Sequence, residues 1–311
     1  MKDEKMAKTR TVSRAALLLA VLMLVPFCLL AGCNNADQPD PATTAAPDSA
    51  PDPTEAPTDP ADTPTEPVAP PTEAQTDAPV VPVVKKALIS GGGAGNNIYS
   101  ASVALCEKKN PRIILLCQAG KDTVSGVQSY YNTMRKYSND IEAITLCTKI
   151  YDPQELHDKI VGADLIMVGG GQSEYMMDTW VKFGVDQYLI EAYNKGVVCC
   201  GGSAGGMCWT YKGWNNFYVL PDDEYYFFDG LDVVPVYYGP HFSNSELWAQ
   251  FDSAIRKETN PKYNIGYAME NGSALVFIDG VATKAVRENG TEHIYTYTFA
   301  DGKWSRVEYN Y

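Results

Sequence analysis

Residues 196–205 read Gly-Val-Val-Cys-Cys-Gly-Gly-Ser-Ala-Gly, an apolar run that leads directly into a Gly-x-Ser-x-Gly motif. This order predicts a buried strand that ends in a tight turn, with Ser203 at the turn and a helix after it. Small residues are needed beside the serine because larger side chains would clash across such a turn. Backbone N–H groups at the helix start could hold an oxyanion. The motif therefore indicates a serine hydrolase, with a glycine-rich loop or a phosphate cradle as the alternative.

Strand and helix patterns alternate on the N-terminal side of this motif. This alternation predicts an α/β fold with a mostly parallel sheet flanked by helices, and a site at the carboxyl ends of the strands. Three of those ends carry glycine clusters, which fits one shared site. The expected strands are 86–90, 112–117, 141–147 and 164–168, and the expected helices are 97–109, 124–137, 153–161 and one long helix over 174–194.

The pattern changes in the C-terminal part of the chain to alternating Val, Ile, Tyr and Thr. Residues 273–310 are expected to form antiparallel strands. Their turns are predicted at Asp279-Gly280, Asn289-Gly290 and Asp301-Gly302, because Asp-Gly and Asn-Gly favour tight hairpin turns.

The N-terminus has the features of a bacterial lipoprotein leader. Basic residues precede an apolar run over 15–30, and Leu30-Ala31-Gly32-Cys33 then matches a lipobox. An uncleaved anchor or an ordinary secretory signal is the alternative, but the run is short for a spanning helix. We therefore expect residues 1–33 to be a leader and lipobox whose Cys33 carries diacylglycerol. The chain would then be extracytoplasmic and lipid-anchored to the bacterial cell membrane.

Residues 34–84 are rich in Pro, Thr, Ala and Asp and contain no aromatic residue, Lys or Arg. Such a segment buries too little apolar surface to fold, so a disordered spacer is predicted. It supplies most of the formal charge of −13, so this charge says little about the catalytic domain expected over 85–311. The sequence shows no basic stripe that would indicate nucleic-acid binding.

The six cysteines of residues 85–311 lie mostly in apolar patterns, as small core residues do. They form no C-x-x-C pair and no Cys/His ligand spacing, so neither a metal site nor a cofactor is predicted. A serine nucleophile needs a base, and the chain has three histidines: His157, His241 and His293. His241 is favoured because Gly239-Pro240 fixes the backbone just before it. The alternative is a loop histidine packed against Phe242.

Three motifs together resemble the peptidase E family of serine peptidases, which includes aspartyl dipeptidases and cyanophycinases. They are Val168-Gly169-Gly170-Gly171-Gln172, Gly201-Gly202-Ser203-Ala204-Gly205-Gly206 and Gly239-Pro240-His241-Phe242. They occur in the family's order, and the resemblance covers nearly all of the chain from residue 86. It implies a class I glutamine amidotransferase-like fold with serine in place of the usual cysteine. The family usually has Asn where this chain has Gln172.

The resemblance also implies roles for individual residues. Ser203 would be the nucleophile, His241 the general base, and the N–H groups of Gly171 and Ala204 the oxyanion hole, with Gln172 near the substrate. The acid that orients the base is expected to be Glu270, at the start of a loop between two strands. Asp223, in an acidic turn, is the alternative acid.

The expected activity is hydrolysis of small peptides through an acyl-enzyme, with no metal or organic cofactor. The expected partners are a peptide substrate and, through the lipid anchor, the membrane; a homodimer is left open. A non-catalytic surface-binding lipoprotein of the same fold and an esterase or amidase are the competing functions.

Overall fold

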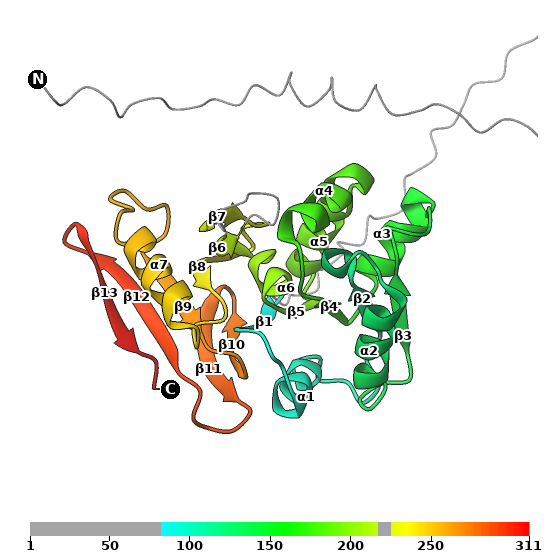
Figure 1. The fold of residues 1–311 in the computed structure, drawn as a ribbon. Helices are drawn as coiled ribbons and strands as arrows, with labels where there is room; N and C mark the ends of the chain where they lie inside the picture. The colour runs from blue at the N-terminus through cyan, green and yellow to red at the C-terminus, as the bar shows by residue number, and fades with distance from the viewer. Residues whose placement is uncertain (1–81, 217–224, 311) are drawn as a thin grey trace, which may run out of the picture. The chain divides into compact units, whose positions relative to one another are not determined.

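The computed structural model describes residues 82–216 and 225–310. The predicted leader with Cys33, nearly all of the predicted spacer and the alternative acid Asp223 lie outside the described residues. The described strands form two sheets, with helices packed around the first of them (Figure 1). Together they confirm the predicted α/β class.

The first sheet has seven strands in the order β11-β10-β1-β5-β4-β2-β3. The five strands from β1 to β3 in this order run parallel, and β10 and β11 add an antiparallel edge next to β1. All five parallel strands lie where the sequence predicts them. The bounds are β1 (Lys86–Ser90), β2 (Ile113–Leu116), β3 (Ile141–Ile144), β4 (Leu165–Val168), β5 (Val198–Gly202), β10 (Ser273–Ile278) and β11 (Val281–Arg287).

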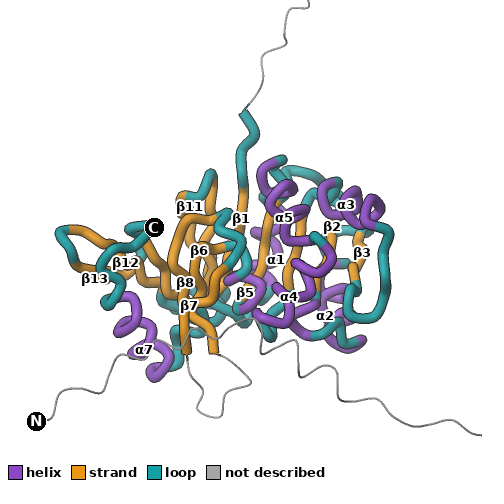
Figure 2. Tube along the Cα trace, turned by 90° about the horizontal axis from the view of Figure 1, so that it is seen from above, coloured by secondary structure: helices purple, strands orange, loops and turns teal. Residues whose placement is uncertain are grey.

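Helices cover both faces of this sheet, as Figure 2 shows from above. Successive side chains of a strand point to opposite faces, and β2 illustrates this with four fully buried residues. Ile113 and Leu115 pack on the face of α1 and α2, whereas Ile114 and Leu116 pack on the face of the helices α3 to α6. The bounds are α1 (Asn96–Ala104), α2 (Val124–Met134), the short 3₁₀ helix η1 (Gln118–Gly120), α3 (Pro153–Val161), α4 (Ser173–Phe183), α5 (Val185–Asn194) and α6 (Ala204–Met207).

The single long helix expected over 174–194 is wrong, because α4 and α5 are separate helices. Gly184 lies between them with φ of 73°, a left-handed conformation that ends α4. Both segments have apolar residues at helical spacing, so the periodicity continues across the break and hides it. The glycine is the only local sign of the change in direction.

The second sheet is mixed and has the order β13-β12-β9-β8-β6-β7. The turns Asp279-Gly280 and Asp301-Gly302 have positive φ at both residues and connect the β10–β11 and β12–β13 hairpins, as predicted. Asn289-Gly290 instead lies between β11 and β12, which belong to different sheets. The bounds are β6 (Thr210–Asn216), β7 (Tyr225–Asp229), β8 (Val234–Gly239), β9 (Ile265–Met269), β12 (Ile294–Ala300) and β13 (Lys303–Glu308), with helix α7 (Ser245–Ile255) between β8 and β9.

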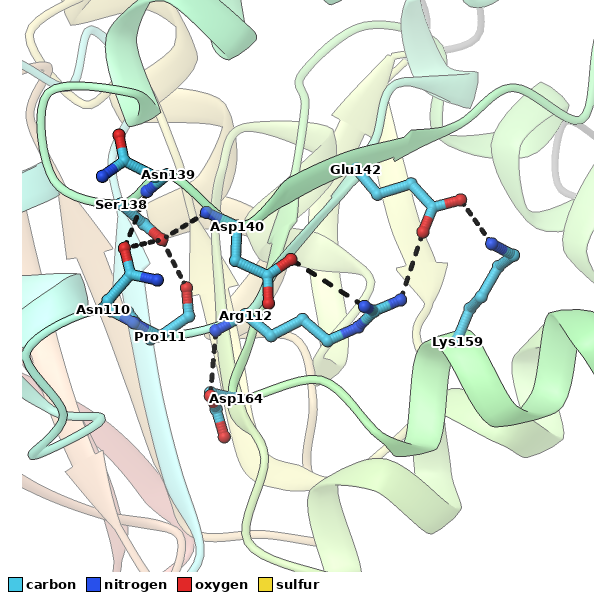
Figure 3. Close-up of polar contacts among 9 residues, drawn as sticks. All are labelled: Asn110, Pro111, Arg112, Ser138, Asn139, Asp140, Glu142, Lys159 and Asp164. Carbon is cyan, nitrogen blue, oxygen red and sulfur yellow. Dashed lines mark hydrogen bonds and ion pairs between the residues drawn. The ribbon is translucent and has the colours of Figure 1, made fainter.

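Polar side chains tie the amino ends of β2, β3 and β4 together (Figure 3). The Asp164 carboxylate accepts the Arg112 N–H at 2.9 Å. The Arg112 guanidinium reaches Glu142 at 3.1 Å, and Glu142 also pairs with Lys159 of α3 at 2.6 Å. These contacts lie at the edge opposite to the carboxyl ends of the strands, where the sequence places the site.

No helix in 82–216 or 225–310 has the length and apolar character needed to cross a membrane. The same residues contain no group of three or more His, Cys, Asp or Glu side chains arranged to hold a metal ion.

Candidate active site

Ser203 lies in the sharp turn between β5 and α6. Its φ of 55° and ψ of −129° put a non-glycine residue in a strained region of backbone space. The neighbouring glycines are required sterically: a Cβ on Gly205 would lie 2.2 Å from the Val168 carbonyl oxygen, and one on Gly201 would lie 2.2 Å from the Gly205 oxygen. This is the strand–turn–helix geometry that the Gly-x-Ser-x-Gly motif predicts.

A buried tyrosine supports this turn from the second sheet. The Tyr238 hydroxyl, on β8, donates to the Ser90 carbonyl oxygen at the end of β1 and lies against Gly206 of α6, where an added Cβ would be 3.0 Å from it. Burial raises the pKa of Tyr238, so its hydroxyl stays protonated and available as a donor. The second sheet is therefore bonded to the end of β1 and packed against the helix that follows Ser203.

His241 follows β8 and reaches the Ser203 hydroxyl. Its φ is 57°, and its backbone N–H donates to the Gly91 carbonyl oxygen at 2.8 Å, which joins it to the glycine turn after β1. Its Nε2 lies 2.9 Å from the Ser203 Oγ. The structure thus brings together the two residues that the sequence selects as nucleophile and base.

The residue on the other side of the imidazole is Asn271, which corrects the expected contact with Glu270. The His241 Nδ1 lies 2.7 Å from the Asn271 Oδ1. The Glu270 carboxylate instead accepts the backbone N–H of His293 at 2.8 Å, so it is held beside β12. The physical reason is that the chain turns at Asn271 and Gly272 directly after Glu270, and this turn brings the Asn271 side chain to the imidazole.

The residues expected to form the oxyanion hole lie in two turns close to Ser203. Ala204 is the first residue of α6, where the helix itself supplies no acceptor for the N–H. Gly171 has φ of 142°, and a Cβ there would lie 2.2 Å from the Ala119 carbonyl oxygen, so only glycine fits. Gln172 donates its backbone N–H to the same oxygen at 2.8 Å and precedes α4.

Two cavities adjoin the catalytic pair, and Ser203 and His241 line both. One has a volume of about 130 Å³ and extends under the glycine turn after β1 toward Ile98 and Tyr99 of α1 and Tyr130 of α2. The other has a volume of about 120 Å³ and extends toward the second sheet. Gly171 lines this second cavity together with Met207, Trp214, Asn215, Tyr225 and Leu247. Gln172 is in neither lining.

Apart from His241, the described walls of the two cavities contain only side chains that are uncharged at neutral pH. Burial raises the pKa of Tyr99 to about 12 and also raises the pKa of Tyr130, so both hydroxyls remain protonated. Among the described lining residues there is no Lys, Arg, Asp or Glu. Arg256 lies at the end of α7 and bonds to Asp252 and to the Trp304 carbonyl oxygen.

The sequence alone does not identify three residues that shape the site: Asn271, Tyr238 and Gly92. Asn271 lies one position after Glu270, so the sequence-based prediction of the His241 partner is wrong by one residue. Tyr238 carried no motif of its own. Gly92 stands in a visible triple glycine, and a Cβ there would lie 2.5 Å from the His241 Cε1 and 2.8 Å from the Asn271 Oδ1. A glycine cluster after a strand was the one signal that could have indicated such close packing.

The chain resembles known peptidases in its sequence. The model of the family described as peptidase family S51 matches residues 87–285. A Bacillus subtilis (strain 168) protein named "Uncharacterized peptidase YgaJ" is 24% identical over 240 residues, which cover 71% of this chain and 96% of that protein.

Solved structures with a similar fold include a peptidase from an acI-B1 Actinobacterium, with a TM-score of 0.50 and 16% identity over 73% of this chain and 98% of that chain. They also include a putative peptidase E protein from Listeria monocytogenes EGD-e, with a TM-score of 0.51 and 15% identity over 66% of this chain and 99% of that chain. At these identities the two structures support the fold alone. The family match spans more than half of the chain and confirms the resemblance to peptidase E: the chain belongs to peptidase family S51 and is a serine-type, peptidase E-like enzyme.

Proposed function

We propose that this peptidase hydrolyses small peptides through an acyl-enzyme formed on Ser203, with His241 as general base. The observation that carries the proposal is the 2.9 Å distance between the His241 Nε2 and the Ser203 Oγ, at a serine held in a strained turn. A nucleophile and a base within hydrogen-bond reach of each other are what acyl transfer requires.

The chemistry follows the general serine-hydrolase scheme. The His241 Nε2 takes the Ser203 proton as the Oγ attacks the peptide carbonyl, and the resulting oxyanion accepts N–H donors from Gly171 and Ala204. The tetrahedral intermediate collapses as His241 gives the proton to the leaving amine, which breaks the C–N bond. Water, deprotonated by His241, then attacks the acyl ester and releases the acid, and Ser203 recovers its proton.

The substrate class follows from the size and charge of the two cavities. Volumes of about 130 and 120 Å³ on either side of the catalytic pair are small for ligand sites and suit short peptides. An acidic side chain would find no cation in the described walls, and an unpaired buried charge is costly. Uncharged residues beside the scissile bond are therefore favoured.

The place of action is also a proposal. The leader and lipobox of residues 1–33 favour a mature chain that begins at lipidated Cys33 and is tethered outside the cytoplasm, with the proline-rich segment as spacer. Replacement of Cys33 by Ala should release the protein or leave an unprocessed precursor. Normal processing and membrane retention of Cys33→Ala would contradict the tether.

The activity is tested with libraries of dipeptides and esters and with the variants Ser203→Ala and His241→Ala. Both variants should lose roughly 10⁴-fold or more in turnover while keeping the wild-type melting temperature, because nucleophile and base act as a unit. Neutral dipeptides should be cleaved faster than those with an N-terminal Asp. Ester cleavage without peptide cleavage would replace the proposal by an esterase, and full turnover by Ser203→Ala would remove it.

A further inference from the structure

Both ring nitrogens of His241 have hydrogen-bonding partners, and these two partners determine which nitrogen carries the proton. The Nε2 faces the Ser203 hydroxyl at 2.9 Å, and the Nδ1 faces an oxygen of the Asn271 side chain at 2.7 Å. An amide oxygen can only accept, so the proton of a neutral imidazole must be on Nδ1. This tautomer leaves the Nε2 lone pair free to take the serine proton, which is the state that a general base needs.

The backbone around Asn271 is held by the glycine turn that follows β1. The N–H of Gly272 donates to the Gly92 carbonyl oxygen at 2.8 Å, and the N–H of Gly91 donates to the Ser273 carbonyl oxygen at 2.9 Å. A Cβ on Gly93 would lie 3.3 Å from the Asn271 Cβ. The loop after β9 and the turn after β1 are therefore packed against each other beside the amide, which fixes the backbone from which Asn271 reaches the imidazole.

No carboxylate takes this place in the described part of the chain. The ion pairs of histidine within 82–216 and 225–310 involve His157 and His293, and none involves His241. The nearest candidate along the chain, Glu270, is bonded through both its backbone N–H and its carboxylate to His293. The base is thus oriented by a neutral group.

We propose that Asn271 is the residue that positions His241, and that the triad of this peptidase is Ser203-His241-Asn271, with an amide where an acid was expected. The inference rests on the proposed function. An amide fixes the tautomer and the ring orientation as a carboxylate does, but it supplies no negative charge to the imidazolium that forms as Ser203 attacks. Orientation and charge stabilisation are therefore separated among the described residues of this site, and Asn271 supplies only the first.

The separation predicts different outcomes for two changes at one position. Asn271→Ala removes the acceptor and should lower the rate of attack by Ser203 roughly 10- to 1000-fold. Asn271→Asp has nearly the same shape and adds a charge that stabilises the protonated imidazole. It should therefore raise the rate and move the acid limb of the pH profile to higher pH by roughly one unit. Glu270→Gln is the matched control and should stay within about twofold of the wild type, since its carboxylate does not meet the imidazole.

The experiment measures inactivation of these four proteins by a fluorophosphonate, with the maximal rate and the half-saturating concentration determined across the neutral pH range. The expected result is a lower maximal rate for Asn271→Ala at unchanged half-saturation, together with the shifted profile of Asn271→Asp. Melting curves show whether each variant is folded. If Asn271→Ala does not fold, the near-isosteric Asn271→Asp still tests the inference.

Three results would overturn the inference. They are a wild-type rate for folded Asn271→Ala, an unshifted profile for Asn271→Asp, or a loss in Glu270→Gln as large as that expected for Asn271→Ala. If the wild-type protein itself does not react, the proposed function fails and the inference falls with it. If the wild type reacts and only the variants behave otherwise, the inference fails alone.

Discussion

The two ends of the parallel strands in the seven-stranded sheet are built differently. Glycine turns follow the carboxyl ends of β1, β4 and β5, whereas charged and polar side chains tie the amino ends of β2, β3 and β4 together (Figure 3). At the first edge, backbone approaches so closely that Cβ atoms on Gly92, Gly171 and Gly205 would collide with their neighbours. At the second, Arg112 and Asp164 link neighbouring strands through hydrogen bonds and ion pairs.

The difference separates two physical tasks. The glycine turns hold strained residues, Ser203 at φ 55° and His241 at φ 57°, in a fixed relation, and this costs stability. The polar network of the opposite edge supplies hydrogen-bonding partners for backbone groups at the strand ends that would otherwise lack them. Changes at the carboxyl edge should therefore act mainly on activity, and changes at the amino edge on stability alone.

Among the changes that compare the two edges, the largest effect is expected from Gly92→Ala. The added methyl group would lie 2.5 Å from the His241 Cε1 and 2.8 Å from the Asn271 Oδ1, in a backbone with φ of 110°. The methyl group should push the imidazole out of hydrogen-bonding position with the Ser203 hydroxyl, and this should lower peptide turnover roughly 100-fold.

The control for this change is Gly290→Ala, which has a similar backbone strain at φ 82° but no atom within 4 Å of the added Cβ. It should lose about 1–2 kcal/mol of stability and keep its turnover. Equal turnover of the two variants would show that close packing on the imidazole is not required.

Tyr238→Phe should have the next largest effect. It removes the hydroxyl that donates to the carbonyl oxygen of the buried Ser90 at the end of β1. We expect a loss of about 1–3 kcal/mol in the free energy of unfolding. Because this hydroxyl also packs against Gly206, three residues after the nucleophile, kcat should also fall, by roughly tenfold. Denaturant unfolding and steady-state kinetics on the same samples measure both. A stability loss with unchanged kcat would mean that the turn is held by its glycines alone.

Asp164→Ala should lower stability without touching activity. The Asp164 carboxylate, whose side chain is 22% exposed, accepts the Arg112 N–H at 2.9 Å and pairs with Lys108 at 2.6 Å. Losing the acceptor for a backbone N–H should cost about 1–3 kcal/mol. Asp164→Asn keeps an oxygen for that N–H and should lose less. A fall in kcat comparable to that of Tyr238→Phe would contradict the separation of the two edges.

Glu142→Gln should have the smallest effect of the series. Glu142 pairs with Arg112 and Lys159, but all three side chains are between a fifth and a third exposed, and such pairs contribute little in water. The expected change in unfolding free energy is below about 1 kcal/mol and decreases further in high salt. A salt-independent loss of several kcal/mol would show that the pair acts as a buried one.

Much of the fold could be predicted because its signals are local. The apolar run before Ser203, the strand–helix alternation and the two Asp-Gly hairpins each depend on neighbouring residues. The break at Gly184 was hidden because the apolar periodicity continues through it. The second sheet was only partly foreseen: its strand β8 pairs in parallel with β6 and β9, and long-range pairings leave no pattern in the sequence.

The site shows the same limit at finer scale. Ser203 and His241 could be selected because glycine and proline residues next to them in the sequence indicate a fixed backbone. The partner of the His241 Nδ1 could not, because Glu270 and Asn271 are adjacent and only the path of the loop decides which of them turns inward. Residue chemistry favoured the carboxylate, and the geometry of the turn brings the amide to the imidazole instead.

The central claim, that Ser203 is a nucleophile activated by His241, is tested most directly by mass spectrometry of the protein after treatment with a fluorophosphonate. The account predicts a single phosphonyl adduct on the peptide that contains Ser203. The adduct should be absent in Ser203→Ala and formed at a rate reduced roughly 10⁴-fold in His241→Ala. An adduct on another residue, or equal labelling of the wild type and His241→Ala, would contradict it.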